Sequence, residues 1–173
     1  MGSGATENQI WVTYALSEED VPKALTLCTS LRKVLTWRKV GVIVSQKLGS
    51  HPWRECLSEA FDFYFELEEH RNTKGLKEND FVKLFPLTLK SFEKILVLAP
   101  NMLVIKQCDK LFDEEQEGNG NQEFVLTREN GMSIFLVKPS PKIFNVLMTH
   151  TDFPRTNGNG TGWFHTRYYA ALE

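Results

Sequence analysis

The residues best placed to form a ligand site follow an apolar run, Ile95 to Leu98, which ends in a break that contains a proline. A run this short, with charge on one side, predicts a strand buried on both faces of a sheet. Pro100 ends the strand because it donates no ladder hydrogen bond and restricts the residue before it. In open α/β sheets, ligands bind just past the carboxyl end of such a strand. That position holds Ala99, Pro100 and Asn101, which offer no carboxylate, thiol or imidazole.

Other reactive side chains lack the spacing of a catalytic or metal site. Asp109 and Asp113 stand four residues apart, which is typical of a solvated helical turn, with replacement metal ligands as the alternative. Neither the histidines nor the cysteines follow metal-ligand spacing, so we expect reduced, buried thiols and no metal site. These residues are His51, His70, His150 and His165, with Cys28, Cys56 and Cys108.

Composition and charge narrow the classes of partner. The net charge of −2 and the pI near 6.1 argue against a nucleic-acid-binding protein, which would carry a basic field. No apolar stretch approaches the roughly 20 residues that a membrane span needs. We therefore expect a cytoplasmic or nuclear protein with no membrane and no nucleic-acid partner. Its 173 residues fit one domain over 9–173, preceded by a flexible terminus or expression-tag remnant over 1–8.

The elements around the focal strand alternate between strand and helix. Strands are predicted over Gln9–Tyr14, Val40–Ser45 and Phe63–Leu67 because these stretches are rich in β-branched and aromatic residues. Between them, Ser17 as a cap precedes one helix and Pro52 opens another, which ends near Ala60. This alternation predicts a parallel sheet with right-handed crossovers. The first helix should pack on the sheet through an apolar stripe formed by Val21, Leu25, Cys28, Leu31 and Leu35.

The rest of the chain extends the same pattern. A helical stripe leads into the focal strand, and Pro86 must either kink this helix or mark its first turn. Two more strands are predicted over Phe124–Thr127 and Met132–Val137, followed by a helix that begins at Pro141 with Ser140 as its cap. No glycine-rich fingerprint follows the first strand, so a dinucleotide site or a P-loop is not expected.

Five stretches in order resemble the glycogenin family of glycosyltransferases, family 8. They are IWVTYALSEEDVPKALTLCTSL, FVKLFPLTLKSFEK, ILVLAPNMLVI, CDKLFD and GMSIFLVKPSPKIFNVL, and together they span roughly Ile10 to Met148. The resemblance implies a GT-A-type nucleotide-sugar transferase fold, a Rossmann-like α/β architecture in which a mostly parallel sheet has helices on both faces. It also implies a retaining transferase that uses UDP-glucose and manganese to glucosylate itself and that pairs as a dimer.

The site residues that this family would supply are largely replaced. Its metal-binding Asp-x-Asp falls on Ala99, Pro100 and Asn101, where only Asn101 could lend a neutral oxygen. The uridine-contacting positions become Tyr14, Ala15, Ser17 and Asp20, of which only Ser17 keeps a comparable polar reach. Asp20 would place a negative charge near a diphosphate. A lysine beside the donor is kept as Lys83, and the alternative for it is an exposed helix lysine. The sugar-contacting turn becomes Gly131, Met132 and Ser133.

The chain also stops before the segment that holds the family's acceptor tyrosine, metal-binding histidine and second lysine. We therefore expect a C-terminally shortened, degenerate domain with no cofactor, a pseudoenzyme that acts as a protein-interaction or dimerisation module. Its partner would be another protein or a second copy, contacted through Trp163, Phe164, Tyr168 and Tyr169, because large exposed aromatic patches mark interfaces. The alternative for these four residues is a C-terminal flap that packs on its own domain. The alternative is a divergent glycosyltransferase that still binds a nucleotide sugar without the usual metal site.

Overall fold

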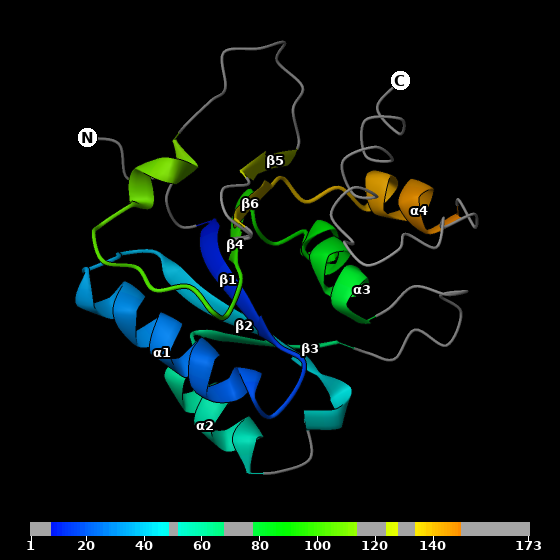
Figure 1. Cartoon of the computed structure of the whole chain (residues 1–173). Helices are drawn as coiled ribbons and strands as arrows, with labels where there is room; N and C mark the ends of the chain where they lie inside the picture. The colour runs from blue at the N-terminus through cyan, green and yellow to red at the C-terminus, as the bar shows by residue number, and fades with distance from the viewer. Residues whose placement is uncertain (1–7, 49–51, 68–77, 114–123, 128–133, 150–173) are drawn as a thin grey trace.

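A six-stranded sheet with the order β3-β2-β1-β4-β6-β5 forms the centre of the computed structural model, which describes residues 8–48, 52–67, 78–113, 124–127 and 134–149 (Figure 1). The strands β1 to β4 run parallel to one another, and β6 is antiparallel to both of its neighbours. The predicted mostly parallel sheet is therefore confirmed. The strands are β1 (Gln9–Ala15), β2 (Lys39–Ser45), β3 (Phe63–Leu67), β4 (Lys94–Leu98), β5 (Phe124–Thr127) and β6 (Ile134–Val137).

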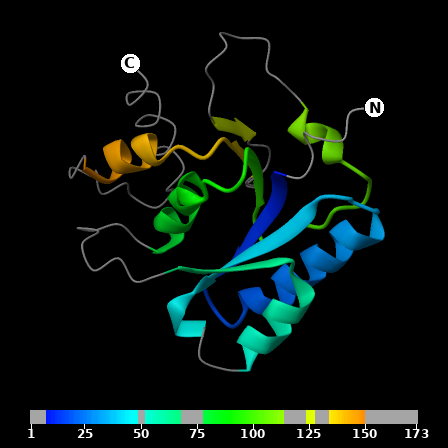
Figure 2. The same cartoon turned by 180° about the vertical axis from the view of Figure 1, so that it is seen from behind.

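Helices cover both faces of this sheet, as predicted (Figures 1 and 2). One face carries α1 and α2, and the other carries α3, η2 and α4. Successive residues of β1 point to opposite faces, so Trp11 belongs to the core under α1, and Ile10 belongs to the core under α3. The helices are α1 (Asp20–Lys33), η1 (Gln46–Leu48), α2 (Trp53–Ala60), α3 (Glu78–Leu84), η2 (Phe85–Thr88), η3 (Asp109–Phe112) and α4 (Pro141–Thr149).

Prolines and one serine set several helix boundaries where the sequence places them. Pro52 is the N-cap of α2, and α4 begins at Pro141. The hydroxyl of Ser140 accepts the backbone N–H of Ile143 at 3.5 Å, which fits its predicted role as a cap. Pro86 removes a backbone donor, so the α-helical geometry of α3 stops at Leu84 and continues as a 3₁₀ turn.

The end of α1 differs from the predicted apolar stripe. Leu35 was expected in the core, but its side chain is 80% exposed and its φ angle is +60°. The N–H of Leu35 donates to the carbonyl of Arg32, and the N–H of Thr36 donates to that of Leu31. This pair of bonds is a Schellman motif, whose left-handed position usually holds glycine. The helix therefore ends before Leu35 can reach the sheet.

The cysteines fit the predicted pattern only in part. Cys28, Cys56 and Cys108 are free thiols, and Cys28 is buried with its Sγ 3.3 Å from the carbonyl oxygen of Ala60. Burial raises the pKa of the Cys28 thiol, which remains protonated. Cys56 is exposed on α2, so the expectation of buried thiols was wrong for that residue. Within the described residues, no helix is both long and apolar enough to cross a membrane.

Candidate functional site

The carboxyl ends of β1 and β4 lie side by side where the chain reverses its course across the sheet. The chain passes from β1 to β2 and β3 on one side, then returns to place β4 on the other side of β1. β1 and β4 pair with each other as far as Val12 and Val97. Tyr14 lies two residues beyond Val12, and Ala99 lies two residues beyond Val97. Open α/β sheets bind ligands at such a switch point. The fold thus brings two of the predicted groups of donor-site residues to one edge.

Asp20 closes the loop between β1 and α1 on itself. Its Oδ2 accepts the backbone N–H groups of Leu16 and Ser17, each at 3.2 Å, and the hydroxyl of Ser17 at 3.0 Å. The ammonium group of Lys23 lies 3.5 Å from its other oxygen. The negative charge predicted at Asp20 is therefore partly compensated within the loop. Ser17 is not the helix cap that the sequence predicts, because α1 begins at Asp20 and Glu19 is its N-cap.

Tyr14 and Ala15 form the end of β1 and offer different groups. Tyr14 is half-buried and packs against the core beneath α3. Burial, with a smaller contribution from the charge of Asp20, raises the pKa of the Tyr14 phenol. The hydroxyl therefore stays protonated at neutral pH and can donate a hydrogen bond. Ala15 is fully buried, so it can contribute backbone groups only.

The turn after β4 does not fit a divalent cation. The N–H of Met102 donates to the carbonyl of Ala99 at 3.2 Å, and both Ala99 and Pro100 are buried. Asn101 is exposed and supplies one neutral amide oxygen, whereas a hard cation prefers several anionic oxygens. Among the residues that the structure describes, no group of three or more His, Cys, Asp and Glu side chains could hold a metal ion.

Lys83 lies on α3, the helix that faces the same core as Tyr14. Its neighbours Val82 and Leu84 are buried in that core, whereas Lys83 itself is half-buried. The alternative of a fully exposed helix lysine is therefore not what the structure has. A half-buried lysine keeps its ammonium group near the surface while its aliphatic stem packs on apolar neighbours.

Other predicted site residues fall outside the described part of the chain. Gly131, Met132 and Ser133 belong to 128–133, and the aromatic residues of the proposed interface belong to 150–173. The roles assigned to them stay predictions. For the interface, sedimentation of the double variant Trp163→Ala with Tyr168→Ala tests whether these aromatic side chains hold a dimer together.

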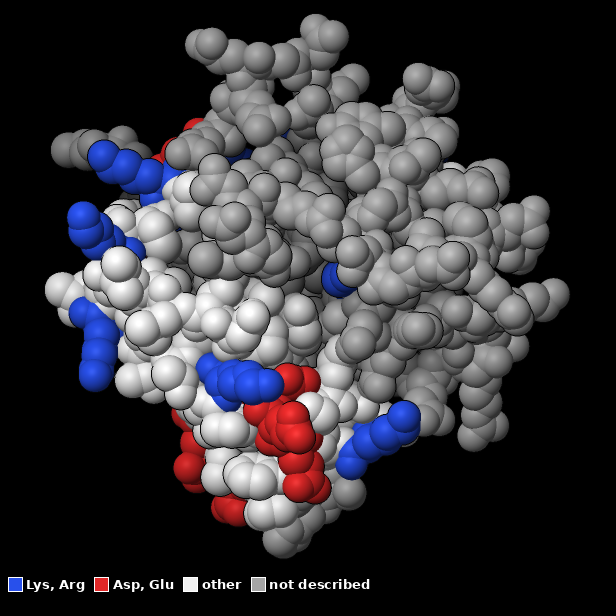
Figure 3. Space-filling model, viewed as in Figure 1, with Lys and Arg blue, Asp and Glu red and all other residues white. Residues whose placement is uncertain are grey.

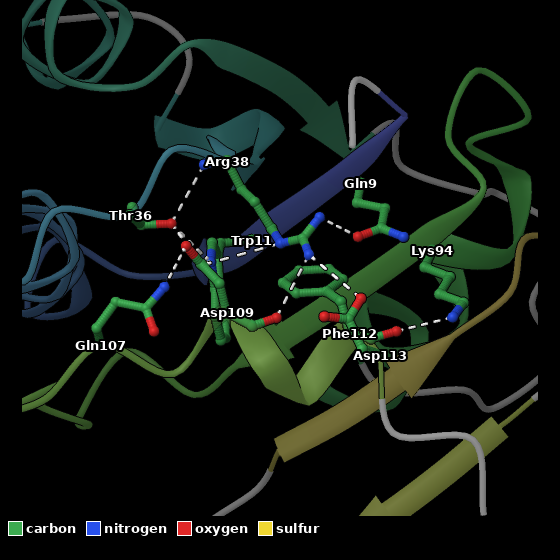
Figure 4. Close-up of polar contacts among 9 residues, drawn as sticks. All are labelled: Gln9, Trp11, Thr36, Arg38, Lys94, Gln107, Asp109, Phe112 and Asp113. Carbon is green, nitrogen blue, oxygen red and sulfur yellow. Dashed lines mark hydrogen bonds and ion pairs between the residues drawn. The ribbon is translucent and has the colours of Figure 1, made fainter. Parts of the chain in front are cut away.

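A dense polar cluster lies at the opposite, amino edge of the sheet (Figure 4). Asp109 is 1% exposed, and its Oδ1 accepts the indole N–H of Trp11 at 2.8 Å and the hydroxyl of Thr36 at 2.6 Å. Its Oδ2 accepts the side-chain amide of Gln107 at 2.9 Å. The sequence suggested that Asp109 is a solvated turn residue, with a metal ligand as the alternative. The structure shows neither, because its carboxylate is buried and accepts hydrogen bonds from three side chains. Asp113 is exposed, as expected.

Arg38 anchors the same cluster from the start of β2. Its side chain is buried, and its guanidinium donates to the side-chain oxygen of Gln9 and lies 3.9 Å from a carboxylate oxygen of Asp109. The guanidinium carbon also lies 4.3 Å from the centre of the Phe112 ring, which is cation–π geometry. A buried charge requires such compensation because desolvation costs several kcal/mol. The cluster therefore ties η3 to β1 and to the residues just before β2.

Sequence reasoning missed this cluster because its members are far apart along the chain. Trp11 and Asp109 are separated by 98 positions, and Thr36 and Asp109 by 73. One available signal was Trp11 within a buried strand, since a buried indole N–H requires an acceptor. A second was Arg38 directly before a buried strand.

Comparisons with known proteins agree with the fold and with part of the predicted function. No protein-family profile matches the chain. Glycogenin-1 of Caenorhabditis elegans is 26% identical over 164 residues, which cover 90% of this chain and 37% of that protein. The chain therefore spans well under half the length of this relative. The crystal structure of the glycosyltransferase GlyE of Streptococcus pneumoniae TIGR4 superposes with a TM-score of 0.55 at 13% identity, covering 87% of this chain and 41% of GlyE.

These likenesses correct the prediction of an inactive protein, and they confirm the predicted resemblance and the predicted fold class. The expectation of a protein without enzymatic activity was wrong, because the proteins that the chain resembles are glycosyltransferases rather than inactive proteins. Replacement of the Asp-x-Asp was an argument from single positions, and the likeness of the overall sequence to glycogenin-1 points the other way. The sequence is similar to that of glycogenin-1, and the fold is like that of a glycosyltransferase of known structure, which confirms the predicted resemblance and the GT-A-like α/β fold class.

Proposed function

We propose that this domain is a divergent glycosyltransferase that binds a nucleotide sugar at the carboxyl ends of β1 and β4 without an Asp-x-Asp-type metal site. The observation that carries the proposal is the switch point itself, where Tyr14 and Ala99 follow the last paired residues of two adjacent parallel strands. The likeness to glycogenin-1 and to a glycosyltransferase fold supports a sugar nucleotide as the ligand.

Two residues at this edge, together with Lys83 on the helix that covers the same core as Tyr14, suggest how a diphosphate would be held. Lys83 supplies a compact positive charge, which attracts phosphate oxygens without the geometry of a bidentate contact. The exposed amide of Asn101 can donate to a phosphate oxygen, and the protonated hydroxyl of Tyr14 can donate beside it. The loop that Asp20 closes holds its backbone in place before a ligand arrives, which reduces the ordering cost of binding.

Calorimetry with UDP-glucose tests the proposal, with titrations in manganese and in a chelator. We expect the two dissociation constants to agree within about threefold, a difference below about 1 kcal/mol. Lys83→Ala and Asn101→Ala should each weaken binding about tenfold, or about 1.4 kcal/mol. Lys90→Ala is the matched control, because Lys90 is an exposed lysine outside this edge.

Turnover is measured by release of UDP and by transfer of labelled glucose to protein or added sugar acceptors. Release that depends on Lys83 and persists in the chelator supports a metal-free transferase. Binding that requires manganese contradicts the absence of a metal site. Failure to bind UDP-glucose under either condition contradicts the proposed function itself.

A further inference from the structure

Exposed apolar side chains gather on two stretches of the described chain. Leu35 is 80% exposed and Trp37 63%, and both follow the end of α1. Leu103 is 61% exposed and Ile105 77%, and both lie in the segment after β4. We call these two stretches, 33–37 and 102–110, the α1-end face.

Hydrogen bonds join the two stretches of this face. The backbone N–H of Val104 donates to the hydroxyl of Ser30 on α1 at 3.1 Å. The hydroxyl of Thr36, between Leu35 and Trp37, donates to Asp109 at 2.6 Å. Figure 1 shows the segment after β4 running past α1 toward η3. These two hydrogen bonds therefore hold the two stretches next to each other.

Segment 102–105 lies outside the sheet, but it shares two properties with an unpaired edge strand. Burial alternates along it, with Met102 and Val104 half-buried and Leu103 and Ile105 exposed, as in an extended chain. Within the described part of the chain, the backbone groups of Leu103 and Ile105 make no hydrogen bond, whereas the N–H of Val104 is bonded inward to Ser30. A row of unbonded N–H and C=O groups is a template for another extended chain.

The charge on this face is basic. Lys33, Lys106 and Lys110 are exposed, and no carboxylate of a described residue lies within ion-pair distance of their ammonium groups. Figure 3 shows lysine and arginine side chains along this side of the molecule and acidic side chains around the other end of α1. Asp113, at the end of η3, already lies 3.7 Å from Arg38.

Leu35 gives a separate reason to assign a function to this face. It occupies the left-handed position of a Schellman motif, where a leucine is strained by roughly 1 kcal/mol relative to glycine. Its exposed side chain recovers little of that cost by burial within the domain. Strain of this kind is concentrated at functional sites.

We propose that the α1-end face binds an extended acidic segment of another protein, which pairs with 102–105 as an added strand. Its apolar side chains, at alternate positions, would contact Leu103 and Ile105, and its carboxylates would approach the three lysines. Strand addition combines main-chain hydrogen bonds with contacts at alternate side chains. A membrane surface fits less well, because hydrocarbon cannot satisfy the free backbone groups. This proposal is independent of the sugar-nucleotide site.

The test uses a fluorescent synthetic peptide in which glutamate alternates with leucine, isoleucine and valine, and a counterpart with lysine in place of glutamate. Fluorescence anisotropy should show saturable binding of the acidic peptide with a dissociation constant on the order of 10–100 µM, and none of the basic peptide. Ile105→Pro should weaken binding at least about tenfold, because proline removes a donor that has no partner among the residues that the structure describes. Lys106→Glu with Lys110→Glu should do the same, whereas Lys90→Glu should have no effect.

Circular dichroism confirms that each variant is folded, and Leu103→Ser with Ile105→Ser tests the side-chain contacts without a proline. Equal binding of both peptides, or binding that Ile105→Pro leaves unchanged, overturns the proposal. No saturable binding up to about 1 mM acidic peptide also overturns it. A dimer that Ile105→Pro dissociates would assign the face to a second copy of the chain. Binding to phosphatidylserine vesicles without peptide binding would assign it to a membrane.

Discussion

The two edges of the sheet differ in how their polar groups are used. At the amino edge, the carboxylate of Asp109 is buried and accepts hydrogen bonds from three side chains, and the guanidinium of Arg38 lies beside it. At the carboxyl edge, Ala15, Ala99 and Pro100 are buried and apolar, and Asp20 bonds to its own loop. The edge that is richer in ionisable side chains is the one that holds the fold together.

The comparison shows that charge alone does not locate a ligand site. A buried carboxylate that accepts three side-chain hydrogen bonds stabilises one arrangement, whereas a switch point is where open α/β sheets bind ligands. The turn after β4 has no carboxylate that could bind a metal ion for the diphosphate. In the proposed site, Lys83 and neutral donors would therefore have to hold the diphosphate.

The strongest test of this contrast is Asp109→Ala at the amino edge. It would remove the closer acceptor of the Trp11 indole N–H and the buried carboxylate beside Arg38, so we expect the free energy of unfolding to fall by about 3–5 kcal/mol. Urea denaturation followed by fluorescence measures the change. Asp113→Asn is the control, since it removes an exposed partner of the same arginine and should cost below about 1 kcal/mol. Similar losses in both variants would remove the distinction.

At the carboxyl edge, Asp20→Ala should have an intermediate effect. Two backbone N–H groups and the Ser17 hydroxyl would lose their acceptor, which should lower the free energy of unfolding by about 1–2 kcal/mol. Asp20→Asn keeps an acceptor oxygen and should cost less. If UDP-glucose affinity fell for Asp20→Ala but not for Asp20→Asn, loop order rather than charge would be the contribution of this residue to the site.

A smaller change of opposite sign is expected for Leu35→Gly. Glycine adopts a φ of +60° without strain, and the lost leucine side chain is mostly exposed, so the free energy of unfolding should rise by about 0.5–1 kcal/mol. Thermal unfolding against Leu35→Ala separates the backbone effect from loss of the side chain, since alanine retains the strain. A destabilised glycine variant would show that Leu35 contributes packing to the free domain.

The smallest effect concerns Asp62, which precedes β3 at the amino edge. Desolvation acts to raise its pKa, but the N–H of Val40 and the positive charges of Arg32 and Lys39 outweigh it and lower the pKa. Its contribution is therefore complete above the unfolded value of about 4 and is lost as pH falls through the lower folded pKa. Asp62→Asn should reduce the acid dependence of the free energy of unfolding by under about 1 kcal/mol. An unchanged pH profile would argue against this ion pair.

The sequence predicted the fold more completely than the site. Short apolar strands alternating with helices were enough to predict a mostly parallel sheet, because local pattern and tertiary burial agree there. Leu35 was misplaced because helical periodicity does not reveal where a helix ends in a left-handed residue. Asp109 was misjudged because its partners lie on β1 and just before β2. Side chains so distant along the chain meet only after folding.

The position of β1 has a consequence for the order of folding. This strand comes first in the sequence but lies inside the sheet, where it pairs with β2 on one side and with β4 on the other. β2 follows after one helix, whereas Gln9 pairs with Lys94 far along the chain. Contacts between such distant segments carry a loop-closure cost that slows folding. During synthesis, β1 to β3 with α1 and α2 can assemble early, but one edge of β1 stays unpaired and prone to aggregation until β4 emerges.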